Sequence, residues 1–132
     1  MAMGNFLEVA TLNSALRGGT FPTISTPYVS LFTTDPGETG TTGAEVSGGG
    51  YTRKAGSFTA PAQVDDEAVV YNSTEIDYGV ATATWGNITH AAIFDAATGG
   101  NLLFHVKLTS EKLIETNDSL RFAPNKLAVY LS

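Results

Sequence analysis

The chain has 132 residues, no cysteine, 15% charged residues and a formal net charge of −6. This length is typical of one domain and is enough to bury a core without covalent staples. Without cysteine, the chain has no disulfide, zinc–thiolate site or thiol nucleophile. The seven Lys and Arg residues are scattered along the sequence, so no basic stripe predicts nucleic-acid binding. No apolar run reaches the roughly 18 to 20 residues of a membrane-spanning helix, and we expect no secretory signal.

Residues 5–17 form the one segment with a clear helical pattern. Its apolar residues recur at steps of three and four and form one stripe, made of Phe6, Val9, Leu12 and Leu16. Gly18 and Gly19 follow, at the place where glycine commonly ends a helix. A helix this short needs tertiary contacts to persist. Two interpretations stay open: a lid on the sheet of its own domain, or an arm packed on a neighbouring subunit.

The rest of the chain carries short runs in which apolar and polar residues alternate, a pattern that predicts strands. The clearest pair spans residues 88–94 and 102–108 and is joined by a turn at Thr98-Gly99-Gly100-Asn101. Further strands are expected at residues 27–34, 51–58, 68–71, 74–78, 111–114, 119–122 and 126–131. We expect residues 68–71 and 74–78 to pair around a turn at Asn72-Ser73.

This spacing of short strands predicts an all-β fold, an antiparallel β-sandwich or jelly-roll-like domain with one short N-terminal helix. The predicted organisation is a helical arm over residues 1–20 followed by a single β-sandwich domain over residues 21–132. The strand at residues 51–58 is expected at a sheet edge, because its charged residues would protect an exposed edge.

The segment between residues 35 and 50 is a long loop with six glycines and no apolar periodicity. Loops of this length inside a compact domain are usually functional or mobile. Its Ser47-Gly48-Gly49-Gly50 tract lacks the spacing of a phosphate-binding loop, so a flexible hinge is the favoured interpretation.

The residues that could carry chemistry form no recognisable motif. His90 and His105 lack metal-ligand spacing, and the acidic run Asp65-Asp66-Glu67 lacks the pattern of a calcium loop. We therefore expect no catalytic, cofactor-binding or metal-binding residues and no enzymatic activity. Aromatic residues such as Trp85 and Tyr51 offer two interpretations, because aromatic rings can stack on sugars or pack into a core or subunit interface.

The order of several motifs resembles a family of small virion proteins of tailed bacteriophages, often labelled tail fibre proteins. The segments that carry the resemblance are YVSLFTTDPGE (28–38), EVSGGGYTR (45–53), ATWG (83–86), THAAIFDAATGGNLL (89–103) and LRFA (120–123). The resemblance extends over most of the chain, from about residue 5 to 131. It implies a non-enzymatic structural protein of the virion.

A small domain without repeats lacks the length of a fibre shaft, so the favoured function is capsid decoration, in which a cement protein stabilises the assembled shell by binding only that shell. The expected partners are other copies of the chain, in a homotrimer or another small homo-oligomer, and the major capsid protein or another virion protein. The expected assembly contacts are the helical stripe and the loop carboxylates Asp35, Glu38 and Glu45.

The alternative function is a tail-fibre or tail-tip module that binds a host surface glycan through Trp85 and Tyr51. In either case we expect a protein made in the host cytoplasm and carried on the virion, on the capsid exterior or alternatively on the tail. Neither nucleic acid nor membrane is an expected partner, and no cofactor is expected.

Overall fold

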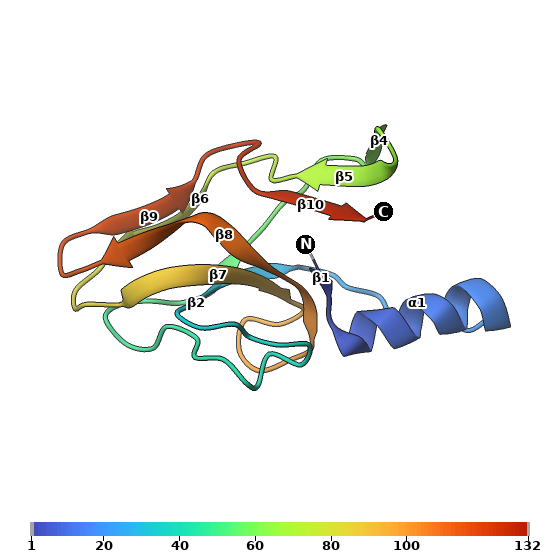
Figure 1. Cartoon of the computed structure of the whole chain (residues 1–132), viewed down its shortest axis with the longest axis horizontal. Coiled ribbons are helices and arrows are strands. Elements are labelled where there is room, and N and C mark those ends of the chain that lie inside the picture. The colour runs from blue at the N-terminus through green and yellow to red at the C-terminus, as the bar shows by residue number, and fades with distance from the viewer. Residues whose placement is uncertain (1, 132) are drawn as a thin grey trace.

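The computed structural model describes residues 2–131 and has an all-β antiparallel fold with one helix in that range, as predicted. Its largest sheet has five strands (Figure 1). From one edge to the other, these are β1 (Ala2–Met3), β8 (Leu102–Ile114), β7 (Gly86–Phe94), β2 (Tyr28–Phe32) and β3 (Lys54–Ala55). The predicted hairpin, now β7 and β8, therefore lies at the centre of this main sheet.

Two smaller sheets lie over one face of the main sheet (Figure 1). One has the order β10 (Ala128–Leu131), β5 (Glu67–Tyr71) and β4 (Ala62–Val64), and the other pairs β6 (Ile76–Val80) with β9 (Ser119–Phe122). The main core lies between the layers, where buried side chains such as Leu31, Ile76 and Val129 meet. Tyr78 joins the layers, because its hydroxyl donates a hydrogen bond of 2.7 Å to the Val29 carbonyl.

The opposite face of the main sheet also carries buried apolar side chains. Phe32, Ala92, Phe94 and Leu102 form a second, smaller cluster there. The rings of Phe32 and Phe94 stack with their centroids 6.2 Å apart. Because apolar residues occupy both faces of β2 and β7, these strands are nearly continuously buried, and the second cluster must be covered by the chain itself.

Two strand predictions need correction. Residues 111–114 form no separate strand, because β8 continues to Ile114 and pairs there with Gly86 at the start of β7. Of the predicted strand at residues 51–58, only Lys54–Ala55 pairs in the main sheet, at its edge.

Strands β5 and β6 do not pair with each other as predicted, and Asn72 is the reason. Instead of standing on an exposed turn, this side chain is fully buried. Its amide group donates to the carbonyls of Thr74 and Ala123, and its carbonyl oxygen accepts from the backbone of Leu127 at 2.8 Å. These bonds direct β5 toward β10 and β6 toward β9.

Candidate functional site

Helix α1 (Asn5–Arg17) has the bounds that the sequence predicts, and its first turn is fixed to the main sheet. The Gly4 amide donates to the Leu103 carbonyl at 2.8 Å, and the Asn5 amide donates to the Glu38 carbonyl at 3.0 Å. Leu7 is only 5% exposed and belongs to the main core. At the other end, Gly18 adopts a left-handed conformation with φ of 69° and ends the helix.

The predicted apolar stripe of α1 is exposed for most of its length. Phe6 is half-buried against the core, but Val9, Leu12 and Leu16 are 68%, 60% and 78% exposed. Figure 1 shows the helix leading away from the sheets. The lid interpretation is therefore wrong for this stripe, because Leu7, which is not a member, makes the buried contact with the domain.

The predicted loop carboxylates Asp35 and Glu38 lie on either side of one histidine ring. His105 Nδ1 is 3.7 Å from Asp35 Oδ1, and its Nε2 is 3.7 Å from Glu38 Oε1. The Gly37 amide donates to Asp35 Oδ1 and lowers the pKa of that carboxyl, and the nearby His90 and His105 lower it further. Both carboxylates are well exposed to solvent, while the loop that carries them is held against β8.

The glycine-rich loop contacts the rest of the domain at Gly40 and Gly49, whereas Gly48, which lies between them, and the end of the loop are exposed. Gly40 has φ of +77°, and a Cβ there would lie 2.8 Å from the Phe94 ring. Gly49 has φ of +61°, and its carbonyl accepts a hydrogen bond of 2.9 Å from the Trp85 indole. The loop thus covers the second apolar cluster, and its glycines allow the close approach.

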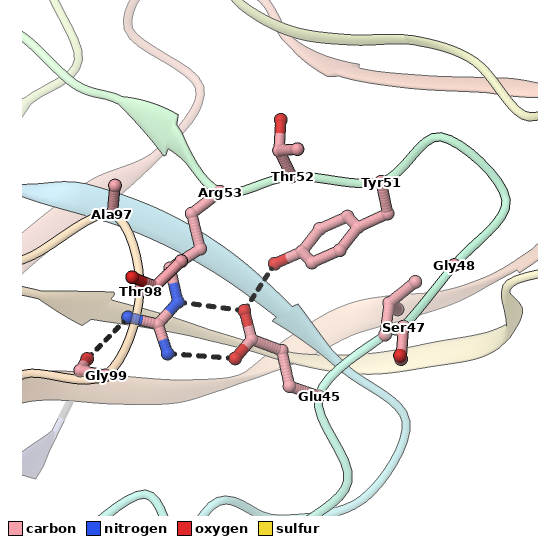
Figure 2. A pocket seen from close by; sticks show the side chains of 10 residues that line it. Glu45, Ser47, Gly48, Tyr51, Thr52, Arg53, Ala97, Thr98 and Gly99 are labelled. Atoms are coloured by element: carbon pink, nitrogen blue, oxygen red, sulfur yellow. Dashed lines mark hydrogen bonds and ion pairs between the residues drawn. The ribbon is translucent and has the colours of Figure 1, made fainter.

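Glu45, the third predicted contact in the loop, forms a partly buried ion pair with Arg53 (Figure 2). The Arg53 Nε and Nη2 atoms each donate to the carboxylate at 2.9 Å, which makes the pair bidentate. Tyr51 donates its hydroxyl to Glu45 Oε2 at 2.8 Å and accepts from the Leu31 amide at 2.9 Å. Burial raises the pKa of Tyr51, so its hydroxyl stays a donor.

Arg53 also fastens the turn between β7 and β8. Its Nη1 donates to the carbonyls of Ala96 and Gly99 at 3.0 and 2.8 Å, and its guanidinium lies 3.7 Å above the centroid of the Phe94 ring. The side chain is only 8% exposed. A recess of about 280 Å³ lies beside the pair and is lined partly by Ser47, Thr52 and Thr98. Because Glu45 is engaged by Arg53 and Tyr51, we interpret this cluster as a structural clasp.

The predicted glycan platform of Trp85 and Tyr51 is not formed. Trp85 is 6% exposed and belongs to the main core. Tyr51 packs edge-on against it, with ring centroids 5.7 Å apart, and stacks on Tyr78. The Trp85 ring is enclosed by core neighbours and offers no face to a sugar, whereas Tyr51 is half-buried and lines the recess beside Glu45, with its hydroxyl bonded to that carboxylate.

One surface that sequence reasoning missed is a groove between β8, β9 and β10. Four of the seven cationic residues of the chain line it, although all seven are scattered along the sequence. These are Lys107, Lys112, Arg121 and Lys126. The signal in the sequence is weak, because the four residues are spread over 20 positions and meet only through the fold.

Two kinds of feature are absent from residues 2–131. That range contains no group of three or more His, Asp or Glu side chains placed to hold a metal ion. None of its helices is long and apolar enough to cross a membrane.

Comparison with known proteins identifies the class. A family model described as podophage GP4 fiber I protein gp80 matches residues 2–130. The chain belongs to this family. It is a structural protein of phage fibres and a component of the virion, which confirms the resemblance seen in the sequence. A search of curated proteins returned no match.

Proposed function

We propose that the chain is a non-enzymatic fibre subunit that assembles with other copies of itself through the exposed face of α1. The observation that carries this proposal is the stripe of Val9, Leu12 and Leu16, which a helix anchored by Leu7 holds in solvent. Exposed apolar surface on a small domain is typical of a protein contact site. Packing against a second copy would remove it from water and contribute about 25 cal/mol per Å² of apolar area.

The order of residues along α1 suits an antiparallel pair related by a two-fold axis. With the axis between positions 12 and 13, Val9 of one helix faces Leu16 of the other. The same alignment brings Glu8, in the first turn, to the level of Arg17, in the last turn, on the opposite flank of the stripe. A self-complementary patch of this kind defines a closed symmetric contact. Of the homotrimer and the other small homo-oligomers expected from sequence, a two-fold pair is therefore the one that we favour.

A substitution in the stripe tests this proposal. We expect Leu12→Asp combined with Leu16→Asp to leave the fold intact, because both side chains are exposed, and to convert the oligomer to monomer in light scattering coupled to size exclusion. The same variant should be lost from purified phage particles. Val80→Asp is the matched control, because Val80 is 62% exposed on β6, outside the helix. Normal self-association of the double variant would contradict the role of α1.

A crosslink tests the antiparallel alignment itself. Val9→Cys combined with Leu16→Cys should give a covalent dimer under mild oxidation, because the alignment places these two positions opposite each other. Val9→Cys alone is the control and should crosslink poorly, because the two copies of position 9 lie seven residues apart along the pair. Equal crosslinking of the single and the double variant would mean that the alignment is wrong even if α1 is the contact.

The position of the subunit on the virion is a separate question. The family description names a fibre protein, and a fibre on the tail fits that name at least as well as capsid decoration. Capsid decoration remains the second candidate, favoured by a compact β domain with a projecting helix that could bind the major capsid protein or another virion protein. Antibody–gold labelling of intact particles separates the two: label confined to the tail supports the fibre, and label over the head supports decoration.

A further inference from the structure

We infer that the groove between β8, β9 and β10 is a binding site for an acidic polysaccharide. The groove has a volume of about 490 Å³, within the range of sites that bind small ligands. Its charge stands out from the rest of the chain. The 13 acidic residues outnumber the seven cationic ones, yet four cations and no described carboxylate line this groove.

An irregularity in β8 brings its lysines into the groove. Ile88 on β7 pairs with Lys112, but His90, only two residues on, pairs with Lys107. The β8 residues 108–111 therefore lie opposite the single residue Thr89. A bulge of this kind bends the strand and redirects its side chains. Because of it, two lysines that are five positions apart, which regular alternation would place on opposite faces, both line the groove.

The cations of the groove are free to bind a ligand. All four are exposed, and within residues 2–131 none of them forms an ion pair. Arg121 lies opposite Asp77 in the pairing of β9 with β6, but no ion pair joins them in that range. An anion entering the groove would gain charge-assisted hydrogen bonds without breaking existing ones.

The other residues of the groove suit a sugar chain. Thr109, Ser110 and Tyr130 add hydroxyl groups beside the cations, and Phe122 adds apolar surface. Hydroxyls can both donate to and accept from the hydroxyls of a sugar, and aromatic rings pack against its apolar face. Trp85, one of the two residues of the predicted sugar platform, is enclosed in the core, whereas the polar residues of the groove are exposed to solvent.

Two other polyanions fit the groove less well. An acidic peptide would bind by adding a strand, and the unpaired outer edge of β8 beyond His105 would be the place for it. Lysines on an exposed edge oppose such pairing, and β8 carries two of them there. A single-stranded nucleic acid is held largely by successive bases that stack on a row of aromatic rings, and among the described lining residues of the groove only Phe122 and Tyr130 are aromatic.

This inference is independent of self-assembly through α1, because the groove shares no residue with the helix. The two proposals can therefore fail separately. Variants of the groove should keep the oligomeric state of the native protein, and the Leu12→Asp, Leu16→Asp variant should keep the groove.

The test uses the full chain immobilised on a sensor and five probes of matched length. We expect polygalacturonate and heparin to bind at low salt and neutral dextran not to bind. Polyglutamate and oligo-dT should bind at least about tenfold more weakly than polygalacturonate. Affinity for the acidic polysaccharides should fall as salt increases, because each cation that pairs with an anionic group releases counterions.

Two charge-matched variants locate the site. Lys107→Gln combined with Lys112→Gln and the single Lys54→Glu each change the net charge by two units, and Lys54 lies on β3, outside the groove. We expect the groove variant to lose about tenfold in affinity for polygalacturonate and the Lys54 variant to lose less than about threefold. Equal losses in the two variants would overturn the site. Tighter binding of polyglutamate or of oligo-dT would overturn the ligand class.

Discussion

The clasp around Arg53 and the stripe on α1 are opposites in how they use their side chains. Arg53 carries a charge, yet it is enclosed by a carboxylate, two carbonyls and an aromatic ring. Leu12 and Leu16 are apolar, yet they lie in solvent. The charged residue thus stabilises the interior, and the apolar residues are available to partners. Residue type alone would assign the two roles the other way round.

The same contrast separates the two clusters of charge in the molecule. Glu45 and Arg53 neutralise each other inside the loop-covered face, whereas the cations of the β8–β10 groove have no such partner within residues 2–131. A charge that is already paired contributes to the fold, and one that is unpaired and exposed is available for recognition. If this separation holds, substitutions of the interior residues should lower stability, and substitutions of the partner-facing residues should leave it nearly unchanged.

The largest effect is expected from Arg53→Ala. It leaves Glu45 as a partly buried carboxylate without its bidentate partner, which typically costs about 3 to 5 kcal/mol. Urea unfolding followed by fluorescence measures the loss. The control is Lys54→Ala, the adjacent cation, which should change the free energy of unfolding by less than about 0.5 kcal/mol. Equal, small losses in both would mean that the clasp does not stabilise the fold.

A smaller effect is expected where the loop crosses the second apolar cluster. Gly40→Ala should destabilise by about 2 to 4 kcal/mol, because it adds left-handed backbone strain and a contact with the Phe94 ring. Gly48→Ala is matched for the backbone, with φ of +78°, but has nothing within 4 Å of the new methyl group. Its loss should be about 1 to 2 kcal/mol. Identical losses would show that the loop does not press on the cluster.

The enclosed tyrosines predict a loss of stability in alkali. Burial raises the pKa of both Tyr51 and Tyr78 above the ordinary value of 10.0. Above that pH the unfolded tyrosines release protons while the folded ones keep them. The stability is therefore fully present below pH 10 and falls as the pH rises further. Urea unfolding between pH 8 and 11 measures this slope, which Tyr51→Phe should reduce.

The smallest effect is expected on the helix stripe. Leu16→Ala should change the free energy of unfolding of the monomer by less than about 0.5 kcal/mol, because this side chain is 78% exposed. Leu7→Ala, one substitution of the same kind on the buried side of the same helix, should cost about 2 to 5 kcal/mol. The measurement is made at a dilution where the protein is monomeric. A large loss of free energy of unfolding for Leu16→Ala in the monomer would mean that the stripe packs on its own domain, as the lid interpretation holds.

Local patterns in the sequence predicted the elements that depend on local chemistry. The helix bounds follow from the spacing of apolar residues and from Gly18, and the central hairpin follows from alternation around Gly99 and Gly100. A helical period identifies residues that share a face, but it does not say what covers that face. For this reason the periodicity predicts which residues form the stripe but does not predict that the stripe is exposed.

Features that depend on distant residues could not be predicted in the same way. Asn72 resembles a turn residue in sequence, but its buried bonds reach Phe122, Ala123 and Leu127, which are at least 50 positions away. The clasp joins Arg53 to Gly99 across 46 positions. Polar side chains gain such partners only when the fold is complete, so neither feature has a signature in the local sequence.

The attachment of α1 has a mechanical consequence. The chain enters the helix from β1 and leaves it toward β2, and in the main sheet these two strands lie on either side of the β8–β7 hairpin (Figure 1). A pull on α1 is therefore divided between two strands that flank the same hairpin. Because β1 is a two-residue edge strand and β2 lies inside the sheet, tension on the helix would detach β1 from β8 first and then load β2, which pairs with β7 over its whole length.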